Sequence, residues 1–386
     1  MLKSCLHILP VAALWLCVAT ADAQTSAPAS DLQLREALQA AERGQAVAPG
    51  QHPAQGWIEY ASLRRNLDTI PVTQAEAFLK RWQGQAVAET FRAEWLRALY
   101  KRQDWAGIRS AASPSATNTA LRCIALDARQ RGGNIDAQWT RDLQSIWRGS
   151  GKSLPDECDG PFAVLAARGE LTDALRWERI EKAAAEWDPS VMRSAANGLP
   201  ADQRALATDY AAFLQSPSER ALTWPKTERS RLMASHGLAR LAKADPLAAE
   251  AQLARYAPAL GFSEADNGPV LYQAALWTVA SYLPDSARLL NRVPESAYDD
   301  RLHEWRVRGA LSRSEWAAAP APIARMGDKQ RNDSRWTWFA ARTTELGGDK
   351  VSAQALYQRA ATASDFHAFL AADRPNLPYP LCPLAL

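Results

Sequence analysis

The feature that most constrains the fold of this chain is a helical spacing of apolar residues that continues along its whole length. Apolar side chains recur three or four positions apart, as in Phe91, Trp95 and Ala98, which places them on one face of a helix. No stretch of β-branched residues alternates convincingly with polar ones, so we expect almost no sheet. The sequence therefore predicts an all-α protein.

Signals for helix starts and stops are frequent. Asp188 and Asp245 each precede a proline, a typical cap and first helical residue, and Thr73 with Glu76 matches a capping box. Glycines such as Gly149 end helical patterns. Their spacing predicts on the order of twenty helices of about 10 to 16 residues between residues 31 and 373. Joined by short turns, these helices should stack as antiparallel pairs, which is typical of a solenoid.

One degenerate repeat supports this architecture. It occupies residues 334–361 and resembles a tetratricopeptide-like (TPR-like) unit, with Ala341 in a first helix, a Gly347-Gly348 turn, and Ala353, Tyr357 and Ala360 in a second helix. The small residues let the two helices approach closely, while the tyrosine fills the gap between neighbouring pairs.

Charge and composition exclude some function classes. The 386 residues carry 45 Lys and Arg against 42 Asp and Glu, a formal net charge of +3, which is too balanced for a nucleic-acid-binding surface. Tryptophan is abundant, with 15 copies. Indole rings can stack on sugars, but most of these tryptophans fall on the apolar side of a helical pattern, which favours packing between helices. No single tryptophan is assigned a binding role.

Apparent catalytic and ligand-binding motifs are weak. Gly151-Lys152-Ser153 reads as the end of a phosphate loop, but Ile146 occupies the position of the opening glycine and no strand is expected before it. The histidines show no metal-ligand spacing, and no G-x-S-x-G string is present. The sequence predicts no cofactor, metal or nucleotide site.

The amino end has the pattern of a cleavable signal peptide. Lys3 supplies the positive charge, residues 8–19 form an apolar segment, and Ala21-Asp22-Ala23 is a cleavage site. We place the signal peptide at residues 1–23, a flexible mature end at 24–30, and the protein in the periplasm. Leu16 before Cys17 is not the small residue that a lipid-anchored cysteine requires. No later segment is long and apolar enough to span a membrane.

Three cysteines remain after the signal peptide: Cys123, Cys158 and Cys382. An oxidising compartment makes pairing plausible, and a Cys123–Cys158 bridge would stabilise the fold by roughly 3 to 4 kcal/mol. The alternative is two buried free thiols.

Six strings together resemble the amino-terminal superhelical part of the soluble lytic murein transglycosylases. They are residues 119–127 (TALRCIALD), 151–159 (GKSLPDECD), 171–181 (LTDALRWERIE), 281–286 (SYLPDS), 299–311 (DDRLHEWRVRGAL) and 364–379 (SDFHAFLAADRPNLPY). The resemblance implies a right-handed, superhelical, U-shaped α-solenoid of TPR-like hairpins over residues 31–373, with residues 374–386 beginning a linker. It also favours the cysteine bridge.

The same family implies a reaction whose catalytic residues are not found in this sequence. Family members cleave the β-1,4 bond between N-acetylmuramic acid and N-acetylglucosamine and leave a 1,6-anhydromuramyl end, using one Glu as acid and then base. That Glu lies in an E-S-x-aromatic string followed by G-L-M-Q. Glu295-Ser296-Ala297-Tyr298 matches the first string but no G-L-M-Q follows, so Glu295 is interpreted as a solvated turn carboxylate. No catalytic residue is assigned.

Two hypotheses remain open at this stage. The chain is either a truncated family member, inactive alone, that forms the superhelical part of a peptidoglycan-cleaving enzyme, or a non-catalytic periplasmic scaffold. The scaffold would hold glycan strands or other cell-wall proteins in its concave face, as helical-repeat proteins generally do.

Overall fold

The computed structural model describes residues 26–47, 54–113 and 116–381, and their side chains from residue 32 onward. The signal peptide expected at residues 1–23 and the position of Cys382 lie outside the described residues. Contacts divide the chain into two compact units. The first comprises the described residues up to Leu143 together with Pro155–Ala163, and the second comprises Gln144–Leu154 and the chain from Val164 onward.

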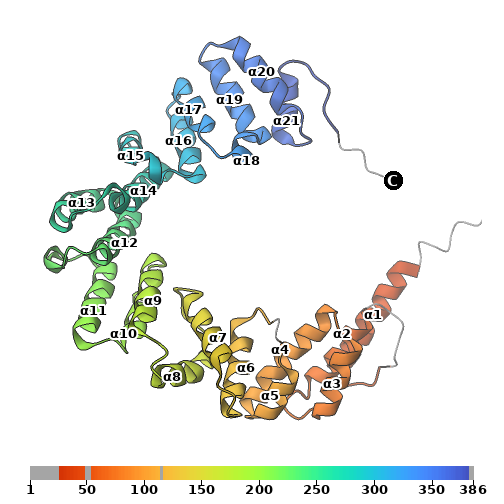
Figure 1. The fold of residues 1–386 in the computed structure, drawn as a ribbon. Coiled ribbons are helices and arrows are strands. Elements are labelled where there is room, and N and C mark those ends of the chain that lie inside the picture. The colour runs from red at the N-terminus through yellow and green to blue at the C-terminus, as the bar shows by residue number, and fades with distance from the viewer. Residues whose placement is uncertain (1–25, 48–53, 114–115, 382–386) are drawn as a thin grey trace, which may run out of the picture. The chain divides into compact units, whose positions relative to one another are not determined.

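Helices follow one another in chain order in both units (Figure 1). The first unit holds α1 (Ser26–Glu42), α2 (Gln55–Arg64), α3 (Val72–Arg81), α4 (Ala86–Lys101), α5 (Trp105–Ala111), α6 (Thr119–Arg131) and the 3-10 helix η1 (Asp156–Cys158). Two helices contribute residues to both units, namely α7 (Ala137–Arg148) and α8 (Asp159–Ala167).

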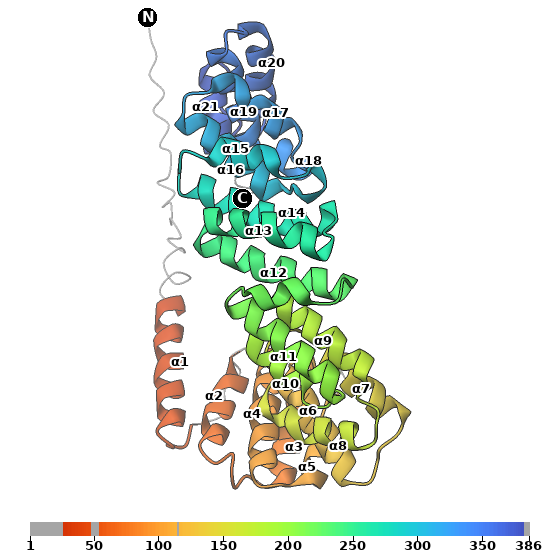
Figure 2. The same ribbon diagram turned by 90° about the vertical axis from the view of Figure 1, so that its left-hand side faces the viewer.

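The second unit continues with helices of similar length. They are α9 (Asp173–Ala185), α10 (Pro189–Ala196), α11 (Ala201–Gln215), η2 (Glu219–Thr223), α12 (Glu228–Ala244), α13 (Pro246–Leu260), α14 (Glu264–Ala280), α15 (Ser286–Arg292), η3 (Glu295–Ala297), α16 (Asp300–Ser312), η4 (Trp316–Ala318), α17 (Pro320–Ala324), α18 (Asp328–Arg331), α19 (Ser334–Leu346), α20 (Lys350–Ala360) and α21 (Phe366–Asp373). Each helix packs mainly on its neighbours in sequence, as α12 does on α11, α13 and α14 (Figure 2).

The predicted all-α fold class is confirmed, because the described residues form helices and turns and no strand. The sequence predicted one helical-repeat domain over residues 31–373 and did not predict that its contacts divide into two units. Helix α1 begins at Ser26, inside the amino end that was expected to be flexible.

Local capping signals were confirmed at two positions and wrong at one. The Asp188 and Asp245 side chains accept hydrogen bonds from main-chain N–H groups of α10 and α13, and each is followed by proline at the first helical position. The capping box predicted at Thr73 is wrong, because α3 already begins at Val72, behind Pro71, and Thr73 lies inside its first turn. A capping box that was not predicted, with Asp266 in place of the usual Glu, begins α14.

The predicted repeat at residues 334–361 is confirmed as a hairpin of α19 and α20. Its alanines and Tyr357 are almost fully buried in one apolar cluster. Gly348 in the turn has a φ of +100°, which a residue with a side chain rarely adopts. The small residues therefore lie where the two helices approach each other.

Tryptophan mainly packs between helices in the described part of the chain. Trp139 and Trp147 are buried, and their indole N–H groups donate to the main-chain carbonyls of Leu126 and Leu175, each at 2.9 Å. Such internal partners satisfy the polar edge of a buried indole. Trp57 differs, because 40% of it is exposed.

Candidate ligand-binding site

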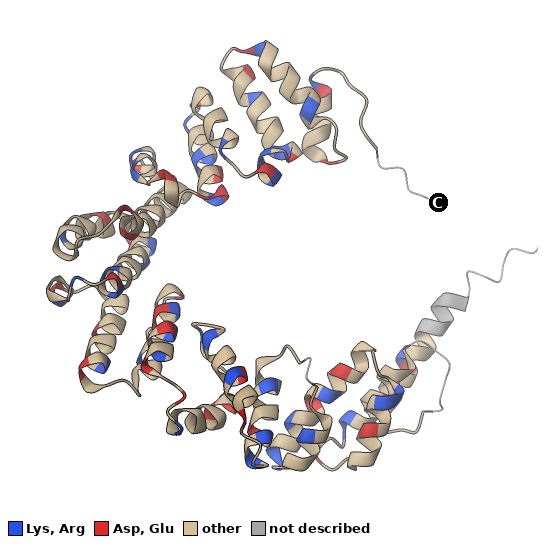
Figure 3. Ribbon diagram, viewed as in Figure 1, with Lys and Arg blue, Asp and Glu red and all other residues tan. Residues whose placement is uncertain are grey.

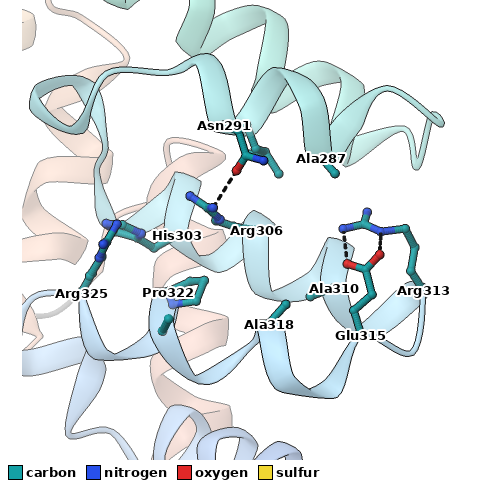
Figure 4. Close-up of a pocket in the computed structure, with 12 residues that line it drawn as sticks. Ala287, Asn291, His303, Arg306, Ala310, Arg313, Glu315, Ala318, Pro322 and Arg325 are labelled. Carbon is teal, nitrogen blue, oxygen red and sulfur yellow. Dashed lines mark hydrogen bonds and ion pairs between the residues drawn. The ribbon is translucent and has the colours of Figure 1, made fainter.

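A cavity of about 350 Å³ lies in the second unit between α15, α16, η4 and α17 (Figure 4). Its volume falls within the range of small-molecule sites, about 300 to 1,000 Å³. Small residues make up much of its wall, while three arginines and one glutamate supply the charge. The lining residues are Ala287, Leu290, Asn291, His303, Arg306, Ala310, Arg313, Glu315, Ala318, Ala321, Pro322 and Arg325.

Arg306, on α16, holds the central position in this cavity (Figure 4). It is half-buried, and its guanidinium donates to Asn291 Oδ1 at 2.8 Å and to the Tyr298 hydroxyl at 3.1 Å. Both acceptors are neutral. No carboxylate among the described residues forms an ion pair with Arg306.

Tyr298 fixes the position of the Arg306 guanidinium through a hydrogen bond. Its hydroxyl donates to the main-chain carbonyl of Leu290 at 2.6 Å while accepting from Arg306. Its ring stacks on His303, with centroids 4.8 Å apart. His303 is 6% exposed, and its Nδ1 atom has no hydrogen-bond partner in the structure. Burial lowers the pKa of His303, which favours the neutral ring at neutral pH.

The other two arginines of the cavity are each paired with a glutamate. Arg313 donates from Nε and Nη2 to the two oxygens of Glu315, both at 2.9 Å. Arg325 Nη1 lies 3.0 Å from Glu295 Oε2. The cavity therefore contains one arginine without an opposing charge and two that are neutralised by their partners.

A second cavity of about 550 Å³ lies between α1 and α2 in the first unit. Trp57 lines it beside Tyr60, and the two rings meet edge to face with centroids 5.8 Å apart. Arg64 and Glu42 are also in its wall. Burial and the neighbouring Glu94 raise the pKa of Tyr60 to about 12, so its hydroxyl is protonated at neutral pH. This cavity combines an exposed indole with polar groups, which is the chemistry used for sugar stacking.

Comparison with known proteins gives the chain its relatives. No protein-family model matches it. The soluble lytic murein transglycosylase of Escherichia coli K12 is 22% identical over 336 residues, covering 86% of this chain and 52% of the relative. The corresponding protein of Salmonella typhimurium is 22% identical over 334 residues. The chain thus spans about half the length of the curated relatives it matches.

Solved structures agree with these relatives. An inactive mutant of the lytic transglycosylase Slt from Pseudomonas aeruginosa is 27% identical, with a TM-score of 0.67, over 91% of this chain and 56% of that one. The chain is homologous to the soluble lytic murein transglycosylases. The 70-kDa enzyme of Escherichia coli, at 21% identity, has a TM-score of 0.74 over 92% of the chain and shows the shared fold.

In this transglycosylase homologue, the string that resembles the catalytic signature lies in a turn beside the cavity of the second unit. Glu295 begins η3, an exposed turn between α15 and α16, and pairs with Arg325 at the cavity. Ser296 donates to Glu264 on α14 at 2.8 Å. The sequence marked Glu295 as a turn residue but gave no sign that it lies beside a group of arginines.

The loop that resembles a phosphate-binding motif and the two cysteines are held by contacts within the protein. Lys152 is exposed in the loop after α7 and lies 3.5 Å from Glu186. A Cβ at Gly151 would come within 2.3 Å of the Lys182 main chain, so this glycine allows the loop to pack against α9. Cys123 and Cys158 are fully buried, and the structure places them in a disulfide between α6 and η1.

Metal-binding clusters and membrane-spanning helices are both absent from the described residues. No group of three or more His, Cys, Asp and Glu could hold a metal ion in the part of the chain that the structure describes. Within those same residues, no helix has the length and apolarity needed to cross a membrane.

Proposed function

We propose that this chain is a peptidoglycan-binding helical scaffold of the lytic transglycosylase type, acting in the periplasm. The observation that carries the proposal is homology over most of the chain, 91% of it in the comparison at 27% identity. The relatives' printed names describe murein transglycosylases. Because the chain matches 52% of their length, binding of glycan strands is the part of their activity that we assign to it.

The charge distribution supports a surface of mixed sign on each unit. Lys and Arg are interspersed with Asp and Glu on the described helices of both units (Figure 3). Many of these charges form ion pairs, such as Arg148 with Glu178 at 3.0 Å and Arg288 with Glu250 at 2.7 Å. Such a mixed surface offers polar and charged partners to a polymer of sugars and peptides, whereas a nucleic acid would need a strongly basic face.

Trp57 is the residue at which we expect a sugar ring to stack. An exposed indole beside Tyr60 and a hollow of about 550 Å³ offers an apolar face for a pyranose ring and polar neighbours for its hydroxyls. We expect Trp57→Ala to weaken binding to purified sacculi by roughly fivefold, equivalent to about 1 kcal/mol. Leu247→Ala, which shortens another exposed apolar side chain, is the matched control.

The experiment that tests the proposed function has two parts. Co-sedimentation of the mature chain with sacculi should exceed that of albumin, and digestion of peptidoglycan followed by mass spectrometry should give no 1,6-anhydromuropeptides. Sedimentation equal to albumin would contradict the proposal. Anhydromuropeptides released at enzymatic rates would show that the chain cleaves as well as binds, and Glu295→Gln would then be the first variant to measure.

A further inference from the structure

We propose that the cavity around Arg306 binds the free carboxylate of a peptidoglycan peptide stem. The inference rests on the proposed function, which supplies the class of polymer. It adds a second point of recognition that reads the peptide rather than the sugar. Three properties of the cavity carry it: an arginine without an opposing charge, an orientation fixed before binding, and a small apolar wall.

The charge balance of the cavity favours a single carboxylate. Arg313 and Arg325 are neutralised by Glu315 and Glu295, whereas Arg306 contacts neutral acceptors only. A half-buried guanidinium gains most from a carboxylate that pairs with it. Because the two glutamates already offset the other arginines, the cavity offers an unpaired positive charge to one carboxylate of a ligand, the one that reaches Arg306.

The geometry leaves donors available on Arg306. A guanidinium has five N–H groups, and Asn291 and Tyr298 use two of them. Tyr298 is itself held by Leu290 and by stacking on His303. Arg306 is therefore fixed before a ligand arrives, which lowers the entropy lost on binding.

The size of the cavity fits a short peptide end. Its volume is about 350 Å³, and part of its wall consists of small side chains, those of Ala287, Ala310, Ala318 and Ala321. A peptide stem ends in a free carboxylate, which is the group that we expect to enter the cavity. His303 also lines the cavity, buried against the Tyr298 ring.

The test compares ligands that differ in their carboxylates. Affinities of the mature chain are measured by calorimetry for a disaccharide tetrapeptide, for the same muropeptide with its carboxyl groups amidated, and for glycan strands stripped of peptide. We expect the affinity of the amidated form to be lower by a factor of at least about ten, because amidation removes a charged hydrogen bond. Equal affinity of the free and amidated forms would overturn the proposal.

Variants locate the binding at Arg306. Arg306→Gln should weaken binding of the tetrapeptide to the level of the amidated form, while Arg301→Gln, an exposed arginine on the same helix that does not line the cavity, should leave it unchanged. Ala321→Glu places a carboxylate at the exposed rim with little risk to folding, and it should also weaken binding. Full affinity in both Arg306→Gln and Ala321→Glu would overturn the proposal.

The two proposals fail in different ways. Sacculus binding by the mature chain without measurable affinity for the tetrapeptide would remove the stem site and keep the scaffold. Carboxylate-dependent binding of the tetrapeptide without sedimentation on sacculi would keep the stem site and remove the scaffold.

Discussion

Arg179 is a buried cation whose contacts explain why a loop that resembles a phosphate-binding motif has a structural role. It is 4% exposed and donates to the main-chain carbonyls of Trp147 at 2.9 Å, Ser150 at 2.8 Å and Lys152 at 2.8 Å. Its guanidinium also stacks on the Trp147 ring, 4.8 Å from the centroid. The carbonyls of the loop thus point toward a cation of the protein itself.

Replacing this cation should therefore destabilise the second unit. We expect Arg179→Met to lower the free energy of unfolding by about 3 kcal/mol, because it leaves three carbonyls without their charged donor. Urea denaturation monitored by tryptophan fluorescence measures the change. Arg204→Met, at an exposed position on α11, should change stability by less than about 0.5 kcal/mol. Equal effects of the two substitutions would mean that the Arg179 contacts contribute nothing.

His236 on α12 makes stability depend on pH in a defined direction. Burial lowers its pKa in the folded protein below the ordinary histidine value of about 6.5, so the unfolded chain binds its proton more readily than the folded chain. Stability from this group is complete above pH 6.5 and decreases as the pH falls toward the folded pKa, with a slope of at most about 1.4 kcal/mol per pH unit.

Thermal unfolding between pH 7.5 and pH 5 checks this dependence. The wild-type melting temperature should fall over that range, and His236→Gln should fall less because it removes one titrating group. Carboxylates with a lowered pKa, such as Glu250 beside Arg288, also reduce stability when they are protonated. That loss of stability occurs at lower pH, below about pH 4.5. Parallel curves for the two proteins above pH 5 would contradict the assignment to His236.

At the scale of helices, Gly237 shows where two elements are in closest contact. A Cβ at this position of α12 would lie 2.5 Å from the Phe213 ring of α11. Alanine favours a helix by about 1 kcal/mol over glycine, but overpacking costs about 1 to 3 kcal/mol. We expect Gly237→Ala to be destabilising by about 1 to 2 kcal/mol in urea denaturation.

The matched control is another helical glycine with space around it. A Cβ at Gly160 on α8 would have its nearest neighbour, Asp127, at 3.8 Å, an ordinary contact. Alanine gains helix propensity over glycine, but the restriction on a residue before proline, here Pro161, offsets part of that gain, so Gly160→Ala should be neutral or slightly stabilising. If Gly237→Ala stabilised the protein to the same extent, the close contact with Phe213 would not constrain α12.

Helices were predictable from the sequence because their signals are local. Asp188 and its proline, or the alanines of residues 334–361, act within a few positions of one another. The cavity was not predictable, because Arg306 meets a side chain 15 positions away, at Asn291, and the pairing of Arg325 with Glu295 spans 30 positions. The packing of α15, α16 and α17 determines which arginine has no carboxylate partner. No residue spacing in the sequence predicts this.

At the scale of the whole chain, the covalent link between Cys123 and Cys158 acts within the first unit, where both residues lie. Closing a loop of 35 positions should stabilise the fold by roughly 3 to 4 kcal/mol. In a helical-repeat protein each element contacts mainly its neighbours, so the effect of reduction should be local. We expect faster hydrogen exchange in α6 and the adjoining α4 and α5 after reduction, with α19 and α20 unchanged.

Thiol chemistry tests the same link independently of stability. The mature chain, denatured without reductant, should contain one reactive thiol, that of Cys382, and three after reduction. Cys382→Ser should remove the single thiol and leave the exchange rates of α6 unchanged, whereas Cys123→Ser should reproduce the effect of reduction. Three reactive thiols before reduction would mean that the mature chain carries free cysteines, and the rigidity of α6 would then have to come from its buried apolar residues, such as Ile124 and Ala128.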